Sequence, residues 1–243
     1  MSGRRQILVL DVGGTHVKLF ASGARDHGEF ASGPKMTPRA MVANVRAMTT
    51  GWRYDVVSIG YPGLVVDGRI ACDPQNLGNG WAGFDFECAF ERPVKIVNDA
   101  AMQALGGYDG GRMLFVGFGT GLGTAMIVDG VLEPMELAHL PYRKGRTYED
   151  YVGHKGLARM GTQKWQHHAL RIMHMLHDAL EPDYIVVGGG NAKLIERLPR
   201  WARRGGNDHA FVGGIRLWDH PRASKRKTRA KPQHRRSTRR GKT

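Results

Sequence analysis

The sequence predicts an α/β protein with two lobes. The chain has 243 residues and 41% of them are hydrophobic, which is enough for a core in one large domain or in two lobes. A strand, glycine turn and strand near the N-terminus return at residues 112–132, as though one hairpin had been duplicated. The glycine-rich segment GGYDGG at 106–111 interrupts the pattern between the two copies. We therefore expect lobes at residues 1–108 and 109–218, followed by a tail at 219–243.

Strands and helices are predicted in the first half from local signals. Thr37-Pro38 is a helix start, Asp67-Gly68 is a hairpin turn, and glycines follow the first strand at the bend. Asn98 and Asp99 stand where a strand meets a helix. The expected elements are strands at 6–12 and 16–22, a helix at 36–48, a strand at 55–61, a hairpin at 64–71, a strand at 93–97 and a helix at 100–105.

In the second half, the clearest element is a helix over 162–180. Its apolar stripe consists of Trp165, Ala169, Ile172, Leu176 and Leu180. The duplicated hairpin comes before it and ends in a tight Asp129-Gly130 turn. A buried strand at 183–190 runs into glycines, and a helix is expected behind it at 191–198.

The formal charge of +14 is concentrated at the C-terminus. Residues 222–242 contain 11 Lys or Arg and no acid, so the rest carries 25 bases against 22 acids, or about +3. With almost nothing apolar to bury, this tail is predicted to be disordered. Two interpretations stay open: a flexible arm for a polyanion such as nucleic acid, the ribosome or inorganic polyphosphate, or a solvated extension without a partner.

The apolar runs and the cysteines also limit the class of protein that the sequence can encode. No run approaches the roughly 18 apolar residues of a membrane-spanning helix, and the first residues show no cleavable signal, so we expect a cytoplasmic protein without a membrane partner. Cys72 and Cys88 form no CxxC or Cys/His ladder, which indicates neither a disulfide framework nor structural zinc. Both cysteines are expected to be reduced and packed.

The first motif with chemical meaning is DVGGTHVK at 11–18. Gly13, Gly14 and Thr15 at a hairpin bend let backbone N–H groups approach phosphate oxygens. Asp11, at the end of the strand, is able to hold a hydrated divalent cation. Taken alone, the motif is better explained as a plain Gly-Gly turn.

Two further glycine motifs follow. GFGTGLGT at 117–124 is not a dinucleotide fingerprint, because Leu122 stands where the third glycine should fall and no helix pattern follows. No GxxxxGK[ST] loop occurs in the chain, so the strand after the glycines favours a phosphate-binding hairpin. GGGN at 188–191 offers a nucleotide or phosphate contact at a helix start, or is an ordinary turn there.

Asp99 is the predicted catalytic residue. Phosphoryl transfer asks a protein to position the acceptor hydroxyl, accept its proton and neutralise phosphate charge. A carboxylate at the end of a strand, beside the amide of Asn98, is suited to the first two tasks. The alternative role of Asp99 is that of a helix cap.

Seven segments together resemble the ROK family (repressor, ORF, kinase) of sugar kinases, over about residues 6–198. Within that family the chain is most similar to polyphosphate glucokinases. The segments, in order, are DVGGTHVK, IGYPGLV, NLGNGW, VNDA, GFGTGLGTAMIVDG, ELAH and DYIVVGGG.

The resemblance implies a two-lobed actin-like ATPase (ribonuclease H-like) fold, a hexose such as glucose, Mg²⁺, ATP or polyphosphate as the donor, and a homodimer. It implies that Asp99 is the general base for transfer to the 6-hydroxyl. The other positions it implies are Asn76, Asn98, Glu136 and His139 for the sugar; Asp11, Gly13, Gly14, Thr15, Gly119, Thr120 and Gly121 for phosphate and metal; Lys18 near a phosphate; and Gly188, Gly189 and Gly190 for a nucleotide.

Several positions depart from the family pattern. No cysteine follows His139, where many members carry a zinc element, and this favours the polyphosphate subgroup. Ala138 replaces a usual glycine, and Ala101 stands where Asn or Asp is frequent. The closing segment at 209–219 matches weakly, so we expect its helix to be short or altered. His174 and His177 lie one turn apart, but a metal pair is not favoured.

Two other functions stay open. One is a catalytically weak sugar-binding regulator, or a protein that binds polyanions or nucleic acid through the basic tail. The other is a kinase for a different hexose, since the sequence does not decide which hydroxyls are recognised.

Overall fold

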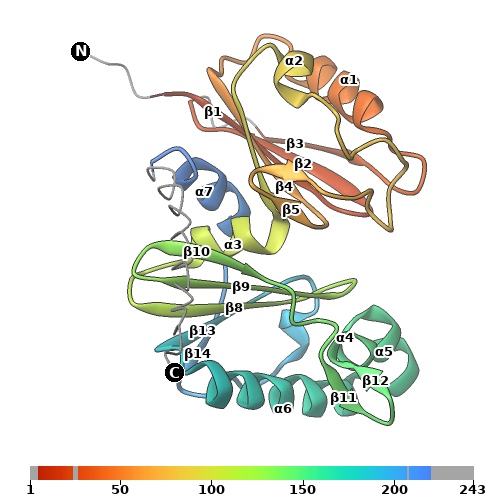
Figure 1. Cartoon of the computed structure of the whole chain (residues 1–243), viewed down its shortest axis with the longest axis vertical. Coiled ribbons are helices and arrows are strands. Elements are labelled where there is room, and N and C mark those ends of the chain that lie inside the picture. The colour runs from red at the N-terminus through yellow and green to blue at the C-terminus, as the bar shows by residue number, and fades with distance from the viewer. Residues whose placement is uncertain (1–4, 24–26, 207, 220–243) are drawn as a thin grey trace, which may run out of the picture.

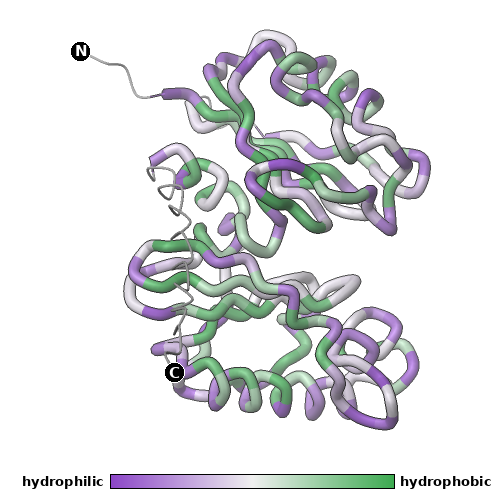
Figure 2. The backbone as a smooth tube through the Cα atoms, in the orientation of Figure 1, coloured by the Kyte–Doolittle hydropathy of each residue, from purple (hydrophilic) through white to green (hydrophobic). Residues whose placement is uncertain are grey.

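The computed structural model describes residues 5–23, 27–206 and 208–219. Two lobes follow one another along the long axis of the molecule, each built on a five-stranded sheet, and two helices lie between them (Figure 1). The strands at the centre of each lobe are the most hydrophobic parts of the chain (Figure 2). The two-lobed α/β architecture expected from the sequence is confirmed.

The first lobe is a mixed sheet in the order β3-β2-β1-β4-β7. β1, β2 and β3 are antiparallel neighbours, whereas β1, β4 and β7 run parallel. Thr37 caps α1, as its sequence signal predicts. The elements of this lobe are β1 (Ile7–Val12), β2 (His16–Ala21), β3 (His27–Ala31), α1 (Pro38–Met48), β4 (Val56–Tyr61), β5 (Val65–Val66), β6 (Arg69–Ile70), α2 (Phe86–Phe90) and β7 (Val94–Asn98).

The parallel strands of this sheet place two candidate site segments at the same edge. Asp11 of β1 is in register with Gly60 of β4, and Gly60 is in register with Val97 of β7. Because parallel strands end at the same edge of a sheet, the residues after β7 emerge beside Asp11.

The second lobe contains the duplicated hairpin in a sheet of order β10-β9-β8-β13-β14. The predicted stripe of the long helix is buried at Trp165, Ala169, Ile172 and Leu176, and it packs on this sheet. The elements are β8 (Arg112–Phe118), β9 (Leu122–Val128), β10 (Val131–Met135), β11 (Pro141–Arg143), β12 (Arg146–Thr147), α4 (Tyr148–Val152), α5 (His154–Met160), α6 (Thr162–Leu180), β13 (Tyr184–Gly188), η1 (Ala192–Leu194) and β14 (Ala202–Arg204).

Two helices cross between the lobes: α3 (Asp99–Gly107) and α7 (His209–Arg216). Their backbones touch, because a Cβ on Gly213 would collide with the carbonyl oxygen of Met102. α7 also contacts β1 and β4 of the first sheet. The buried Ser58 hydroxyl donates to the Gly214 carbonyl (2.6 Å) and accepts from the indole N–H of Trp218 (2.9 Å). The closing helix is short, at eight residues, but tied firmly to β4.

Two local expectations are wrong. The helix predicted over 191–198 is only the single 3-10 turn η1. Pro199 disfavours a helical conformation in the residue before it, and the Arg204 guanidinium donates to the carbonyl of Ala192, which a helix would need for its own bond, and to that of Ile195.

Cys72 and Cys88 are exposed, not packed. Cys72 lies in the loop after β6. In α2, Phe86 and Phe90 take the buried face, which turns Cys88 to solvent.

Other expectations lie beyond these observations. The disordered basic tail falls outside the described residues, apart from Asp219. The division at residues 108 and 109 stays a prediction. No helix in the described part of the chain has the length and apolar character needed to cross a membrane.

Candidate active site

The candidate site is centred on the junction between β7 and α3. Asn98 caps the helix, since its side-chain oxygen accepts from the N–H groups of Ala100 (2.9 Å) and Ala101 (3.3 Å). Its amide nitrogen donates to the carbonyl of Gly63 (3.1 Å). The Asp99 carboxylate accepts from the neighbouring Ala100 N–H (2.8 Å). The capping role that the sequence left open for Asp99 is thus filled mainly by Asn98.

The environment of Asp99 favours its protonated form. Burial raises its pKa to about 7, and the negative charges of Asp11 and Glu136 add to this rise. Burial also raises the pKa of Asp11, although the positive charge of Lys18 opposes the shift. These interactions place Asp11, Asp99 and Glu136 in one region, with Lys18 opposite Asp11 on the neighbouring strand.

A glycine lets α3 lie close to the first sheet. Gly60 is the residue of β4 beside Asp11, and a Cβ there would be 3.5 Å from the Cα of Asp99 and would collide with the Met102 side chain. A larger residue at this position would push the start of α3, and with it Asp99, away from Asp11.

Residues 13–15 form the first glycine bend, between β1 and β2. The Ser32 hydroxyl donates to the Gly13 carbonyl (2.6 Å), and the Ser32 N–H donates to the Thr15 carbonyl (2.8 Å). Gly14 faces Asn76, whose Cβ would lie 3.1 Å from a Cβ on the glycine. The structure therefore brings the predicted sugar residue Asn76 against the predicted phosphate bend.

Residues 119–121 form the second glycine bend, between β8 and β9. The N–H of Leu122 donates to Oε2 of Glu149 (3.1 Å). A Cβ on Gly121 would collide with that same oxygen. Glu149 is a site residue that the sequence reasoning missed, because it lies in a short helix 27 positions away with no motif around it.

The GGGN segment supports the second bend from its other side. The side-chain amide of Asn191 donates to the Gly119 carbonyl (3.2 Å), and its backbone N–H donates to the Phe118 carbonyl (2.9 Å). Gly189 has a positive φ of 80°, and a Cβ there would collide with the Phe118 backbone. Gly188 to Gly190 thus lie beside the second bend without a helix N-terminus behind them. Asn191 was quoted in the motif but given no role of its own.

The second bend belongs to a strand that abuts the start of α3. A Cβ on Gly123 of β9 would come within 2.8 Å of the Ala100 Cβ, so the two backbones are in close contact next to Asp99. Glu136 and His139, on the loop after β10, are both exposed and form an ion pair of 3.7 Å. The start of α3 thus lies against β4 and β9, with Asp11 and Glu136 close enough to raise the pKa of Asp99.

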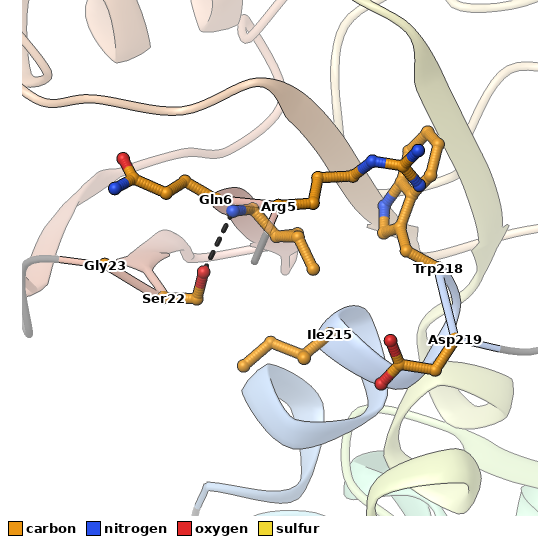
Figure 3. A pocket seen from close by; sticks show the side chains of 8 residues that line it. Arg5, Gln6, Ser22, Gly23, Ile215, Trp218 and Asp219 are labelled. Carbon is orange, nitrogen blue, oxygen red and sulfur yellow. Dashed lines mark hydrogen bonds between the residues drawn. The ribbon is translucent and has the colours of Figure 1, made fainter. Parts of the chain in front are cut away.

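Two cavities lie outside this arrangement. One, of about 320 Å³, is lined by Arg5, Ser22, Ile215 and Trp218 at the opposite end of β1 from Asp11 (Figure 3). The other, of about 440 Å³, is lined by residues 32–36 and Ala40. Neither includes Asp99 or a residue of the two bends.

The described residues do not provide a metal site made of protein side chains alone. Among residues 5–23, 27–206 and 208–219, no three His, Cys, Asp or Glu side chains are arranged so that they could hold a metal ion together. His174 and His177 pack on Trp201, with ring centroids 5.0 and 4.2 Å from that of the indole. Their spacing of one helical turn serves this contact.

Comparison with known proteins finds polyphosphate glucokinases among the relatives in sequence. No model of a protein family matches the chain. A polyphosphate glucokinase of Mycobacterium tuberculosis (strain ATCC 25618 / H37Rv) is 26% identical over 178 residues, which are 66% of this chain and 66% of the relative. The match thus spans slightly less than two thirds of that protein.

Solved structures show the same fold. The inorganic polyphosphate/ATP-glucomannokinase from Arthrobacter sp. strain KM superposes with a TM-score of 0.75 at 22% identity, covering 89% of this chain and 100% of that one. The ROK family glucokinase from Streptomyces griseus, in complex with glucose and AMPPNP, gives 0.71 at 17% identity, covering 87% and 98%. The chain thus has the two-lobed actin-like fold of ROK sugar kinases, and its similarity in sequence to polyphosphate glucokinases is confirmed.

Proposed function

We propose that the protein is a kinase that transfers a phosphoryl group from polyphosphate or ATP to the 6-hydroxyl of glucose or a related hexose, with Asp99 as the general base. The observation that carries this proposal is the position of Asp99. Its carboxylate has a pKa raised to about 7 and lies between β9, which leaves the second bend, and β4, the neighbour of the strand that leads to the first bend. The names of the relatives support the same class of reaction.

The geometry suits proton transfer from a sugar hydroxyl. A base whose pKa lies near the working pH combines a useful ionised fraction with a useful driving force for accepting a proton. Asn98 keeps one amide N–H after its bond to Gly63, and this group is available to orient the hydroxyl. Glu136 and His139, already paired and exposed, are the next polar groups for the sugar.

The proposed phosphate contacts are the backbone N–H groups of the two bends other than those of Gly13 and Gly119, which donate to the carbonyls of His16 and Gly121. Glycines at 13, 14, 119 and 121 leave no Cβ in the way of a phosphate oxygen. The bends enter from different lobes, so a phosphate chain held by both would be fixed along its length. Transfer then needs little beyond this positioning and the neutralisation of charge.

A divalent cation fits beside Asp11. Mg²⁺ is usually held by one or two carboxylates together with substrate phosphates and water, and does not need an all-protein cage. The pKa of Asp11 is raised by burial, and Asp11 in turn raises that of Asp99, so a nearby cation would relieve unfavourable charge. Such an ion would neutralise charge on the transferred phosphate, with Asp11 as its protein ligand.

The choice of donor follows from the same residues. Both donors would use the two bends, whereas a nucleoside needs a further surface beyond Gly188 to Gly190. That surface is reduced here, because the expected helix is a single 3-10 turn. We therefore propose polyphosphate as the better donor.

A homodimer and a cytoplasmic location remain expectations from the family resemblance.

The experiment is a coupled assay of glucose 6-phosphate formation, with ATP and polyphosphate side by side. We expect Asp99→Asn to lower kcat by about 10³-fold, because general base catalysis typically contributes 10²–10⁴-fold. Asp178→Asn, an exposed carboxylate on α6, is the matched control and should act like the wild type. Sugar binding by the wild type without turnover on either donor would favour the regulator instead.

Folding of the Asp99 variant is checked by its melting temperature. The folded state raises the pKa of Asp99 from 3.8 to about 7, so its stabilising contribution is complete below pH 4 and lost as pH rises through 7. Asp99→Asn should therefore melt no lower than the wild type at pH 8. A variant that melts much lower would show that lost activity reflects lost structure.

A further inference from the structure

Outside the basic tail, positive charge is concentrated in one corner of the second lobe. Residues 141–171 contain seven Lys or Arg and two acids, whereas the rest of the chain before residue 222 contains 18 bases and 20 acids. All seven cations are exposed. We refer to them as the basic face: Arg143, Lys144, Arg146, Lys155, Arg159, Lys164 and Arg171.

The cations of the basic face are not neutralised by the protein. None of them takes part in an ion pair within the described residues, where the Lys and Arg pairs involve Arg46 and Arg203. One of them, Arg159, donates to the backbone carbonyl of Asp150 (2.7 Å). Uncompensated like charges raise the energy of a folded surface, and a polyanion relieves this repulsion.

Three of these cations lie on different elements but act on the same residue, His168. Arg143 on β11, Arg171 on α6 and Arg159 on α5 each lower the pKa of His168, after the larger effects of burial and of His167. His168 itself is fixed by a bond of 3.0 Å between its Nδ1 and the Tyr142 hydroxyl. Three of the seven cations therefore lie around one residue, although they come from different elements.

The basic face adjoins the second glycine bend. The N–H of His154, the first residue of α5, donates to the Thr120 carbonyl (3.0 Å). In Figure 1, α4, α5, β11 and β12 form the corner of the lobe next to the turn between β8 and β9. Strongly hydrophilic segments mark the same corner in Figure 2. A linear anion whose end lies at Thr120 would therefore have α5, with Lys155 and Arg159, beside it.

We propose that the basic face extends the donor site and binds the distal part of a linear inorganic polyphosphate chain. This inference rests on the proposed function and adds to it a surface that favours long donor chains. A single-stranded nucleic acid fits less well, because it needs open aromatic platforms for its bases. Tyr148 and Tyr151 are buried here and pack edge-on against Tyr142.

The test compares two triple variants of the full chain. R143Q/K155Q/R171Q removes three charges of the basic face for which the described residues provide no hydrogen bond or ion pair. R39Q/R53Q/R92Q removes three exposed charges from the first lobe and is the matched control. Both variants keep residues 220–243, so the basic tail contributes equally.

Long-chain polyphosphate, of the order of 100 phosphates, and tripolyphosphate are the two probes. We expect R143Q/K155Q/R171Q to weaken binding of the long chain, and to raise its KM, roughly tenfold, since three exposed charge contacts are lost. The effect should shrink in high salt. Binding of tripolyphosphate and ATP, and the KM for each, should stay within about twofold of the wild type. The control variant should match the wild type with all of these donors.

Binding, measured without glucose, separates this inference from the proposed function. Loss of long-chain binding in the variant supports the basic face, even if the wild type transfers no phosphate from polyphosphate. Equal binding by both triple variants overturns the inference and leaves the kinase assignment intact. The inference is also overturned, in favour of nucleic acid, if a single-stranded RNA binds more tightly than long polyphosphate and is not displaced by it.

Discussion

The two glycine bends look alike in sequence but are supported very differently. One side chain, Ser32, holds the first bend by its hydroxyl, and Asn76 packs against it. Separate segments hold the second bend, through Glu149, Asn191 and the backbone of His154. The first bend therefore has freedom to adjust, whereas the second is a fixed platform.

The charged groups beside the two bends also differ, and here the first bend has the more extensive interactions. The first bend follows Asp11, whose carboxylate interacts with Lys18 and with Asp99. The carboxylate next to the second bend, Glu149, is occupied by a backbone N–H. We infer that the first bend contributes charge and metal chemistry, and that the second fixes the position of the donor.

Alanine at one glycine of each bend tests this contrast most strongly. Gly121→Ala should lower kcat/KM for the donor by about 100-fold, because its Cβ would displace the Glu149 carboxylate and break its bond to the Leu122 N–H. Gly14→Ala should cost only about fivefold, since its Cβ would meet the Asn76 Cβ at 3.1 Å, a contact that a shift of a few tenths of an ångström relieves. Steady-state kinetics with varied donor gives both values, and equal losses would contradict the proposed difference.

The acidic region between the bends should appear in the pH profile. As a base, Asp99 must be ionised, and its pKa is raised to about 7. We expect kcat to fall about tenfold per pH unit below 7 and to level off above it. Measurements at saturating sugar and donor from pH 5.5 to 9 check this. A profile that stays flat down to pH 5.5 would be incompatible with Asp99 as the base in this environment.

Glu149→Gln probes the support of the second bend alone. Glutamine keeps an acceptor for the Leu122 N–H but loses the charge that strengthens the bond. We expect KM for the donor to rise about fivefold, with KM for the sugar unchanged, since a charged hydrogen bond is worth about 1 kcal/mol more than a neutral one. Asp150→Asn, at the neighbouring position of α4, is the control. A rise in KM for the sugar instead would assign Glu149 to the acceptor.

Sequence reasoning predicted the parts of the site that depend on local pattern. The hairpins, the 162–180 helix and the position of Asp99 after a strand all follow from periodicity and turn residues. The supports of the second bend did not follow, because Glu149 reaches it from a remote helix and no local signal marks that contact. The helix predicted over 191–198 failed for a related reason: Arg204, from β14, takes the Ala192 carbonyl that the helix would have used.

The smallest effect is expected from removing the hydroxyl that holds the first bend at Gly13. Ser32→Ala deletes the hydroxyl bonded to Gly13, whereas Ser22→Ala deletes the hydroxyl that accepts from the Ile7 N–H (2.9 Å) at the other end of the same hairpin. Each should lower the free energy of unfolding by about 1 kcal/mol. Only Ser32→Ala should also raise KM for the donor, by about threefold, because only it loosens a phosphate contact. If both variants change KM equally, then the hairpin responds as a rigid unit and the first bend is not the adaptable partner of the pair.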